Sequence, residues 1–295
     1  MKYNTSTKIK KNSEKFNNFF HKLLLKKLPK ESLSEVIIYG AMNGGKRIRP
    51  FLIDTFSEIV GLKKNNSLYL SAAVECIHSY SLIHDDLPSM DDDDYRRGKL
   101  SVHKKYNEAE AILAGDSLHD LAFEILSDNL IHDSYKIRLE LINLLSVSTG
   151  IKGLAGGQSL DLKFENKKIS KKNIIKMYKM KTGKLFEYSC LSPFLIAKRS
   201  NREIKFAKNF GSNFGLVFQI IDDYLDLISD YNLLGKTPGK DKIQGKSTII
   251  NHINKRNIID FCEKLIEDFI SNNKLYFNKW NHLEEIIRYI IKRKY

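Results

Sequence analysis

The sequence predicts an all-α protein in which about ten helices form a single domain over residues 1–295. Apolar residues recur at steps of three and four, which is the spacing of one helix face. No sustained alternation of apolar and polar residues indicates a strand, and only 5 prolines and 16 glycines interrupt the chain. With 295 residues, of which 42% are hydrophobic, the chain can bury one substantial core.

The first expected helix is an amphipathic one near the N-terminus. Phe19, Phe20 and Leu23 supply apolar surface, but lysines interrupt the stretch and no small-residue cleavage site follows it. We therefore predict neither a signal peptide nor a membrane span. Two later segments repeat the helical period, at Ala73, Ile77, Tyr80 and Ile83 and again at Ile112, Leu118, Leu121 and Ile125.

Glycine and proline positions divide the chain into its helical pieces. They fall at Gly44–Gly45, Pro88, Gly98, Gly153–Gly157, Pro193, Gly235 and Pro238–Gly239. The lysine-rich stretch 163–184 also carries Ile174, Ile175 and Met177, so we predict that part of it is a helix with a solvated basic face. No linker is long enough to separate two domains.

Composition limits the choice of partner and compartment. The net charge is +14, but the excess is mostly lysine spread along the chain among Asn and Ile. No aromatic-basic motif accompanies it, so we expect no nucleic-acid partner. The three cysteines, Cys76, Cys190 and Cys262, are odd in number and never spaced C-x-x-C, which argues against a disulfide framework and a zinc site. A reducing, cytoplasmic location fits best.

One of two aspartate-rich clusters lies in an apolar helical stretch, Asp222-Asp223-Tyr224-Leu225-Asp226. The four-residue step places Asp222 and Asp226 on one helix face, and Gln219 lies one turn earlier on the same face. Like charges at that spacing repel, so burying them requires a cation. Magnesium suits carboxylate oxygens and keeps water and phosphate oxygens as its other ligands. The cluster therefore predicts a magnesium site, against the alternative of a solvated helix face.

The other cluster comes earlier in the chain and needs a different geometry. Pro88 lacks an N–H and clashes with the preceding turn, so no regular helix runs through it. Asp91 lies six residues after Asp85, and the chain must bulge before Asp91 turns back towards a shared metal. We predict that Asp85, Asp86 and Asp91 are the functional carboxylates and that Asp92–Asp94 are solvated.

Basic residues accompany both clusters, which indicates that phosphate binds beside the metal. The segment Gly44-Gly45-Lys46-Arg47-Ile48-Arg49-Pro50 places three cations at the start of a helix, after glycines that let N–H groups approach an anion. His78 lies two helix turns before Asp85, and a ligand role competes there with that of an ordinary core histidine. The other candidates are Arg96, Arg97, Lys181, Thr182, Lys236 and Lys246. Metal-binding carboxylates with cations for phosphate predict a diphosphate site.

Taken in order, these motifs resemble the trans-prenyltransferase family of short-chain isoprenyl diphosphate synthases, most closely its bacterial farnesyl diphosphate synthases. The first cluster resembles the family motif D-D-x-x-x-x-D, which Arg96-Arg97-Gly98 completes, and the second resembles D-D-x-x-D. Residues 44–50, 77–86 and 156–158 match as well. The likeness covers nearly the whole chain and no essential motif position is missing, so it implies an active enzyme.

The resemblance implies a helical bundle around a central active-site cavity, with the two aspartate motifs facing each other across its mouth. It also implies roles for individual residues. Isopentenyl diphosphate would be bound by Lys46, Arg49, His78 and Arg97. The allylic diphosphate would be bound by Arg96, Lys181, Thr182, Gln219, Lys236 and Lys246, among which Lys181, Thr182 and Gln219 would be catalytic. Magnesium would be bound by Asp85, Asp91, Asp222 and Asp226, supported from behind by Asp86, Asp223 and Asp241.

The implied reaction is a magnesium-dependent 1′-4 condensation of isopentenyl diphosphate with dimethylallyl and then geranyl diphosphate, which gives farnesyl diphosphate through a carbocation. The family also implies three magnesium ions in each site, manganese as a substitute, and a homodimer. The alternatives are a geranylgeranyl diphosphate synthase of the same family and, from another class, a non-catalytic regulatory subunit on the same fold. A terpene cyclase takes one diphosphate, whereas Lys46, Arg49 and Arg97 favour a second.

Product length is expected to depend on the floor of the cavity. In the family an aromatic residue five positions before the first motif goes with a fifteen-carbon product, and Tyr80 occupies that position. It lies about 7.5 Å down the helix from Asp85. Ser81 is small and more directly under Asp85, so the floor depends on Tyr80 leaning inward, and the alternative is that Tyr80 is ordinary core.

Overall fold

The computed structural model describes residues 4–228 and 245–292, and within them the all-α prediction is confirmed. Helices and their connecting loops make up the described fold, together with one two-stranded hairpin. The chain divides into two compact units, which we name the N-terminal unit (Thr7–Ile142) and the C-terminal unit (Met1–Ser6 with Asn143–Tyr295). That both work as one domain stays a prediction.

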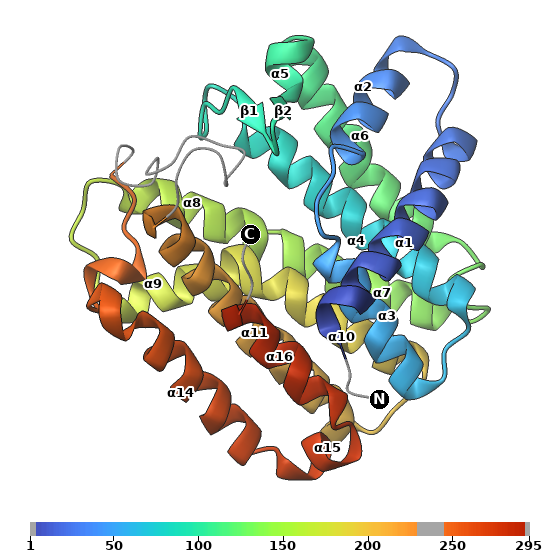
Figure 1. Cartoon of the computed structure of the whole chain (residues 1–295). Coiled ribbons are helices and arrows are strands. Elements are labelled where there is room, and N and C mark those ends of the chain that lie inside the picture. The colour runs from blue at the N-terminus through green and yellow to red at the C-terminus, as the bar shows by residue number, and fades with distance from the viewer. Residues whose placement is uncertain (1–3, 229–244, 293–295) are drawn as a thin grey trace. The chain divides into compact units, whose positions relative to one another are not determined.

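The N-terminal unit, blue to green in Figure 1, is organised by the long helix α4 (Lys64–Asp85). This helix buries Leu70, Val74 and Ile77 at steps of four and three. It packs against α6 and α3, and α2 packs against both α4 and α6. The unit's other elements are α1 (Thr5–Lys27), α2 (Ser32–Ala41), α3 (Ile48–Val60), β1 (Tyr95–Arg96), β2 (Lys99–Leu100), α5 (Val102–Lys105), α6 (Glu108–Ser127) and the first half of α7 (Tyr135–Thr149).

The C-terminal unit is organised by α11 (Asn201–Ile228), against which several other helices of the unit pack. An aromatic cluster closes one end of it: the ring of Phe206 lies 4.3 Å from that of Tyr276 and 5.7 Å from that of Trp280. The packing helices include α10 (Lys184–Ile196), α14 (Ile258–Ser271) and α16 (His282–Lys292). The remaining elements are α8 (Leu154–Phe164), α9 (Lys171–Tyr178), the π-helix η1 (Lys179–Gly183), η2 (Ile249–Asn251), η3 (Lys255–Asn257) and α15 (Lys274–Lys279).

Two expectations about lysine-rich stretches are confirmed. The N-terminal stretch is the amphipathic helix α1, which buries Phe16, Phe20 and Leu24. The stretch 163–184 contains α9, whose Ile174 and Met177 are buried while most of its lysines face solvent. Among the helices that the structure describes, none combines the length and the apolar composition needed to cross a bilayer.

A buried ion pair holds the turn between α2 and α3. Arg47 is 3% exposed and Glu75, on α4, is 2% exposed, and Arg47 Nη1 lies 2.5 Å from Glu75 Oε1. Arg47 also donates to the carbonyl of Ala41 at 2.9 Å and to Asn17 Oδ1 at 2.8 Å. The backbone of Arg47 is left-handed, with φ of 50°, and its side chain is buried. The pair therefore joins four helices at the turn.

Removing the carboxylate of this pair tests its structural role. Glu75→Gln leaves the guanidinium of Arg47 buried without its counter-charge, so we expect the free energy of unfolding to fall by about 3–5 kcal/mol. Denaturant unfolding followed by circular dichroism measures it. Glu124→Gln is the control, because Glu124 is 57% exposed in its pair with Lys27 and should cost at most about 1 kcal/mol. Equal losses in the two variants would contradict the assignment.

Candidate active site

The first aspartate cluster folds back on itself where α4 ends. The helix stops at Asp85, and the backbone N–H of Asp91 donates to the carbonyl of Asp85 at 2.9 Å. The N–H of Asp93 donates in the same way to the carbonyl of Asp86 at 3.1 Å. Pro88 lies at the tip of this loop, and the bulge predicted from it is confirmed. Two carboxylate-bearing residues six apart in sequence are thereby neighbours.

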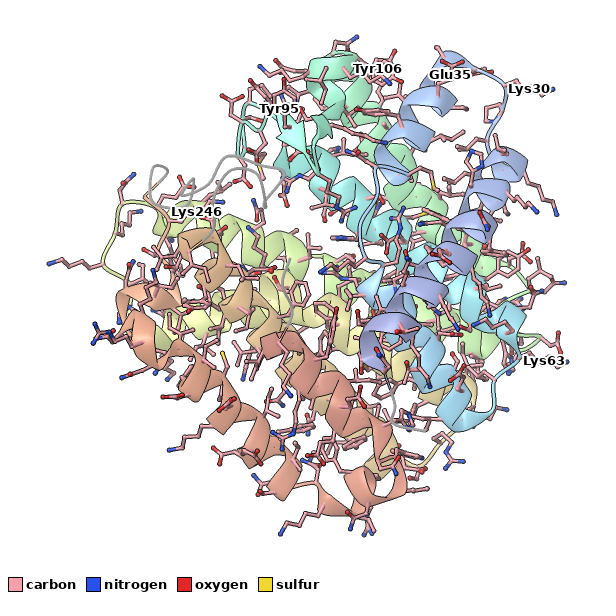
Figure 2. The ribbon with its side chains drawn as sticks, in the orientation of Figure 1. Lys30, Glu35, Lys63, Tyr95, Tyr106 and Lys246 are labelled. Carbon is pink, nitrogen blue, oxygen red and sulfur yellow. The ribbon has the colours of Figure 1, made fainter. Side chains whose placement is uncertain are left out.

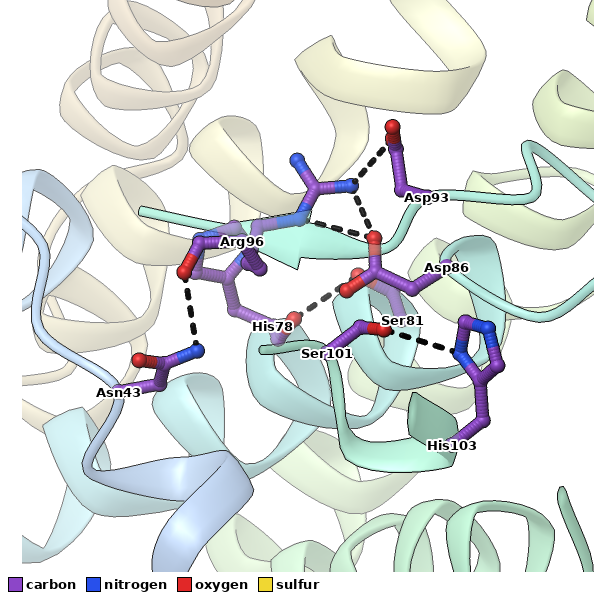
Figure 3. A network of polar contacts seen from close by, with 8 residues as sticks. All are labelled: Asn43, His78, Ser81, Asp86, Asp93, Arg96, Ser101 and His103. Atoms are coloured by element: carbon purple, nitrogen blue, oxygen red, sulfur yellow. Dashed lines mark hydrogen bonds and ion pairs between the residues drawn. The ribbon is translucent and has the colours of Figure 1, made fainter. Parts of the chain in front are cut away.

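A second set of carboxylates in this cluster is engaged by Arg96 (Figure 3). Asp86 is 2% exposed and accepts from Arg96 Nε at 2.9 Å, and Asp93 Oδ2 lies 3.3 Å from Arg96 Nη2. Burial raises the pKa of Asp86, while Arg96 opposes that shift. The expectation that Asp93 is solvated is wrong, because Asp93 is 7% exposed and forms an ion pair with Arg96. Asp86 is thus paired with Arg96, and both its supporting role behind the metal ligands and diphosphate binding by Arg96 stay predictions.

The side chain of Arg97 packs closely against the glycine turn that precedes α3. Gly45 has φ of 105°, which disfavours any side chain, and a Cβ there would lie 2.4 Å from Arg97 Nη1. Arg97 Nη1 also donates to the carbonyl of Gly44. Of the three cations that the sequence groups at this helix start, Arg47 turns into the core, which leaves Lys46 and Arg49 as the candidates for anion binding.

His78 lies in the positive field of these residues. Burial lowers the pKa of His78 well below its usual value, and the charges of Arg49 and Arg97 lower it further. The pKa of Arg97 is itself lowered to about 10, by removal of water and by the neighbouring Arg47 and Arg96. Cations that destabilise each other's charge in this way favour an anion. Arg49 and Arg97 are therefore close enough to His78 for their charges to act on it, and a shared role of the three in binding isopentenyl diphosphate stays a prediction.

In the C-terminal unit, a π-helix carries two predicted catalytic residues. Lys181 and Thr182 lie in η1, a π-helical turn that joins α9 to α10. Lys181 Nζ pairs with Asp161 Oδ2 at 2.6 Å, and Lys246, labelled in Figure 2, lies 3.9 Å from the same oxygen. Gly157 permits this close approach, since a Cβ there would lie 2.2 Å from the Lys181 backbone nitrogen.

A chain of hydrogen bonds fixes the side chains on the neighbouring face of α11. Thr182 Oγ1 donates to Gln219 Oε1 at 2.6 Å, and Gln219 Nε2 donates to Asp223 Oδ1 at 2.9 Å. The other oxygen of Asp223 accepts from the hydroxyl of Tyr178, whose own oxygen accepts from the Ile249 N–H at 2.9 Å. Burial and Asp223 raise the pKa of Tyr178 well above its usual value. Asp223 is therefore fixed by Gln219 and Tyr178, and its supporting role behind a metal site stays a prediction.

The magnesium candidates of α11 are Asp222 and Asp226, one turn apart. Asp226 is 6% exposed and Asp222 is half-buried, so the alternative of a solvated helix face does not describe them. Their donors are carboxylate oxygens, as those of Asp85 and Asp91 are, and such a set suits magnesium or manganese. Lys236 and Asp241 lie outside the described residues.

Two residues with clear roles here were missed by sequence reasoning. Asp161 pairs with Lys181, and Tyr178 positions Asp223. Asp161 comes one helix turn after Gln158 of the matched 156–158 segment, a signal that could have found it. Tyr178 offered no such signal, because a tyrosine among Ile174 and Met177 is indistinguishable from core.

The two chain-length candidates occupy different surroundings on α4. Tyr80 is half-buried, and its ring lies 5.5 Å from that of His84 and 5.2 Å from that of His119 on α6. Ser81 is buried and donates to the carbonyl of His78 at 2.9 Å. Tyr80 therefore packs towards α6, and its role as cavity floor stays a prediction.

Comparison with known proteins gives one consistent result. Residues 30–276 match the polyprenyl synthetase family. The chain is 38% identical over 291 residues to the farnesyl diphosphate synthase of Micrococcus luteus, which covers 97% of this chain and 98% of that protein. It is 40% identical over 264 residues to the farnesyl diphosphate synthase of Escherichia coli, with 88% of each covered. A crystal structure of Helicobacter pylori geranyltransferase, complexed with magnesium and isoprenyl diphosphate, superposes with a TM-score of 0.84 at 29% identity, covering 99% and 98% of the two chains.

The lowered pKa of His78 predicts a pH dependence of stability. Below about pH 6.5, His78 is protonated in the unfolded chain but stays neutral in the folded protein, because its pKa is lowered there. The free energy of unfolding therefore falls as pH falls. The wild-type free energy of unfolding should lose up to about 1.4 kcal/mol per pH unit more than that of His78→Gln. Denaturant unfolding between pH 7 and pH 5 measures the difference, with His21→Gln on exposed α1 surface as control. Parallel wild-type and His78→Gln profiles would refute it.

Proposed function

Because the chain belongs to the polyprenyl synthetase family and is a prenyltransferase, we propose that it condenses isopentenyl diphosphate with dimethylallyl and then geranyl diphosphate to give farnesyl diphosphate. The observation that carries this proposal is that each unit has its own set of groups suited to a diphosphate. Arg49, His78 and Arg97 form one, and the other consists of Lys181 on η1 with Asp222 and Asp226 on α11, the helix against which η1 packs. Two diphosphate substrates distinguish chain elongation from cyclisation of one.

The N-terminal set would bind isopentenyl diphosphate. Lys46, Arg49 and Arg97 supply positive charge, and the lowered pKa values of His78 and Arg97 express how strongly the site disfavours a further cation. A bound diphosphate offsets the repulsion between these cations. Its binding energy therefore comes from the loss of that repulsion as well as from new contacts. The Arg97 guanidinium packs closely against Gly45 and donates to the Gly44 carbonyl, which keeps it beside the glycine turn before α3.

Magnesium would be bound by Asp85 and Asp91 in one unit and by Asp222 and Asp226 in the other. When bound, it would neutralise the charge that develops on the departing diphosphate. Three ions in each site, with manganese as a substitute, are part of the proposal. For both clusters to act on one allylic substrate, the two units must work as the single domain that the sequence predicts.

The residues of η1 and α11 would then assist departure of the allylic diphosphate. Lys181, oriented by Asp161, would contact phosphate oxygens together with Lys246, Lys236 and Arg96. The hydroxyl proton of Thr182 is committed to Gln219, so the oxygen lone pairs of Thr182 are available to a positive carbon. The allylic C–O bond ionises, the isopentenyl double bond attacks the cation, and the released diphosphate takes the proton that is lost.

The proposal extends to assembly and compartment. A homodimer in the cytoplasm would agree with the family resemblance. Cys76, Cys190 and Cys262 are buried and form no disulfide within the described part of the chain, which supports a reducing compartment.

Turnover of aspartate variants tests the reaction and its site together. We incubate the enzyme with radiolabelled isopentenyl diphosphate, an allylic diphosphate and saturating magnesium, and chromatograph the products. Asp85→Asn and Asp222→Asn should each lower kcat by at least about a hundredfold, on the order of 3 kcal/mol, because they weaken charge neutralisation in the transition state. Asp120→Asn, at an exposed carboxylate of α6, should keep wild-type turnover. A wild-type protein without condensation activity would favour the regulatory subunit.

Product length tests the role of Tyr80. The wild type should stop at farnesyl diphosphate, while Tyr80→Ala should open the floor and release geranylgeranyl or longer diphosphates. Tyr135→Ala is the matched control, because Tyr135 is 78% exposed. Geranylgeranyl diphosphate from the wild type would identify the alternative synthase, and an unchanged distribution in Tyr80→Ala would move the length determinant to another residue.

A further inference from the structure

A cluster of metal-ligating side chains lies beside the diphosphate residues of the N-terminal unit but is not among them. Asp92, Asp94 and His103 each offer one ligand atom, and these three atoms lie within 4.8 Å of one another. The two aspartates are exposed, whereas His103 is only 7% exposed. None of the three takes part in the proposed condensation.

The β-hairpin explains why residues this far apart in sequence meet. β1 and β2 pair Tyr95 with Leu100, and one further bond, from the N–H of Ser101 to the carbonyl of Asp94 at 2.9 Å, extends the ladder. His103 follows two residues later in the short helix α5. At the other side, the N–H of Asp92 donates to the carbonyl of Leu87 at 3.1 Å. The chain thus brings the imidazole next to both carboxylates by backbone pairing.

The imidazole of His103 is the observation that points to a ligand. Its Nδ1 lies 3.1 Å from Ser101 Oγ, as Figure 3 shows, and this contact orients the ring. Its Nε2 is buried and has no hydrogen-bond partner among the described residues. Buried ring nitrogens are normally satisfied. A neutral imidazole with a hydrogen bond at one nitrogen and an open lone pair at the other is the usual form of a metal-binding histidine.

We propose that Asp92, Asp94 and His103 bind a divalent first-row transition ion, zinc foremost, at a site separate from the catalytic magnesium. One imidazole with two carboxylates suits zinc, whereas magnesium prefers oxygen ligands alone. Zinc bonds of about 2.0–2.2 Å require the ligand atoms to close by roughly one or two ångströms. The exposed carboxylates can make that movement, and water would complete the coordination.

An ion pair competes with the metal for one of its ligands. Lys104 Nζ lies 2.9 Å from Asp94 Oδ1, and its side chain is 42% exposed. Zinc binding displaces this ammonium group from the carboxylate. The bound ion ties the Asp92–Asp94 loop to α5 across the hairpin that carries Arg96 and Arg97, and so stiffens the segment that presents those two guanidinium groups.

Metal titration of the full chain, stripped of metal and then kept in millimolar magnesium, tests the site. We expect one equivalent of zinc to bind per chain by calorimetry, and one equivalent of cobalt to give visible absorption with an imidazole ligand. Asp94→Asn and His103→Gln should each weaken zinc binding by at least about tenfold. Lys104→Gln should tighten it, because the competing ammonium is gone, and His21→Gln should leave it unchanged.

Two outcomes would overturn the proposal. The first is that no equivalent binds beyond magnesium. The second is zinc binding that persists with equal affinity in Asp94→Asn and His103→Gln, which would place the ion on Asp85 and Asp91. Asp94 is exposed, so its variant keeps the test valid if His103→Gln fails to fold, and circular dichroism checks both. None of these readouts depends on enzymatic activity.

Discussion

Pairing of buried charge is the constraint on which both units depend. A charge removed from water is tolerated only beside an opposite one, and each unit builds its functional segment on such a pair. Arg47 with Glu75 secures the glycine turn that leads into α3, and Lys181 with Asp161 secures the π-helix. The two pairs differ in what they do. The pair of Arg47 with Glu75 holds the backbone alone, while the pair of Lys181 with Asp161 also orients a side chain that we propose contacts substrate.

Partners within the protein also distinguish aspartates that lie next to each other in each of the two motifs. Asp86 and Asp93 are buried against Arg96, while Asp85 and Asp91 are joined through the backbone on the other side of the bulge. Asp223 is held by Gln219 and Tyr178, whereas Asp222 and Asp226 repeat along the same face of α11. In both motifs, aspartates fixed by partners within the protein therefore lie next to the aspartates that we propose as magnesium ligands.

The hairpin between the first motif and α5 combines several functions in few residues. It presents Arg96 to Asp86, seats Arg97 against the Gly45 turn, and brings His103 beside Asp94. The proposed metal ion would act on the same segment that carries Arg97, one residue of the proposed isopentenyl diphosphate set. Binding of substrate and binding of zinc would then be linked through one short backbone element, since both limit its freedom.

The sequence by itself determined the helical fold, the break at Pro88 and the identity of the motif aspartates, because helical period, proline geometry and residue spacing are local properties. It could not determine which neighbour in each charged run turns inward. Arg47 enters the core while Lys46 and Arg49 remain candidates, and Asp93 is buried although it lies in an acidic run. Those outcomes depend on partners distant in the chain, Glu75 on another helix and Arg96 across the loop, which only the tertiary structure brings into contact.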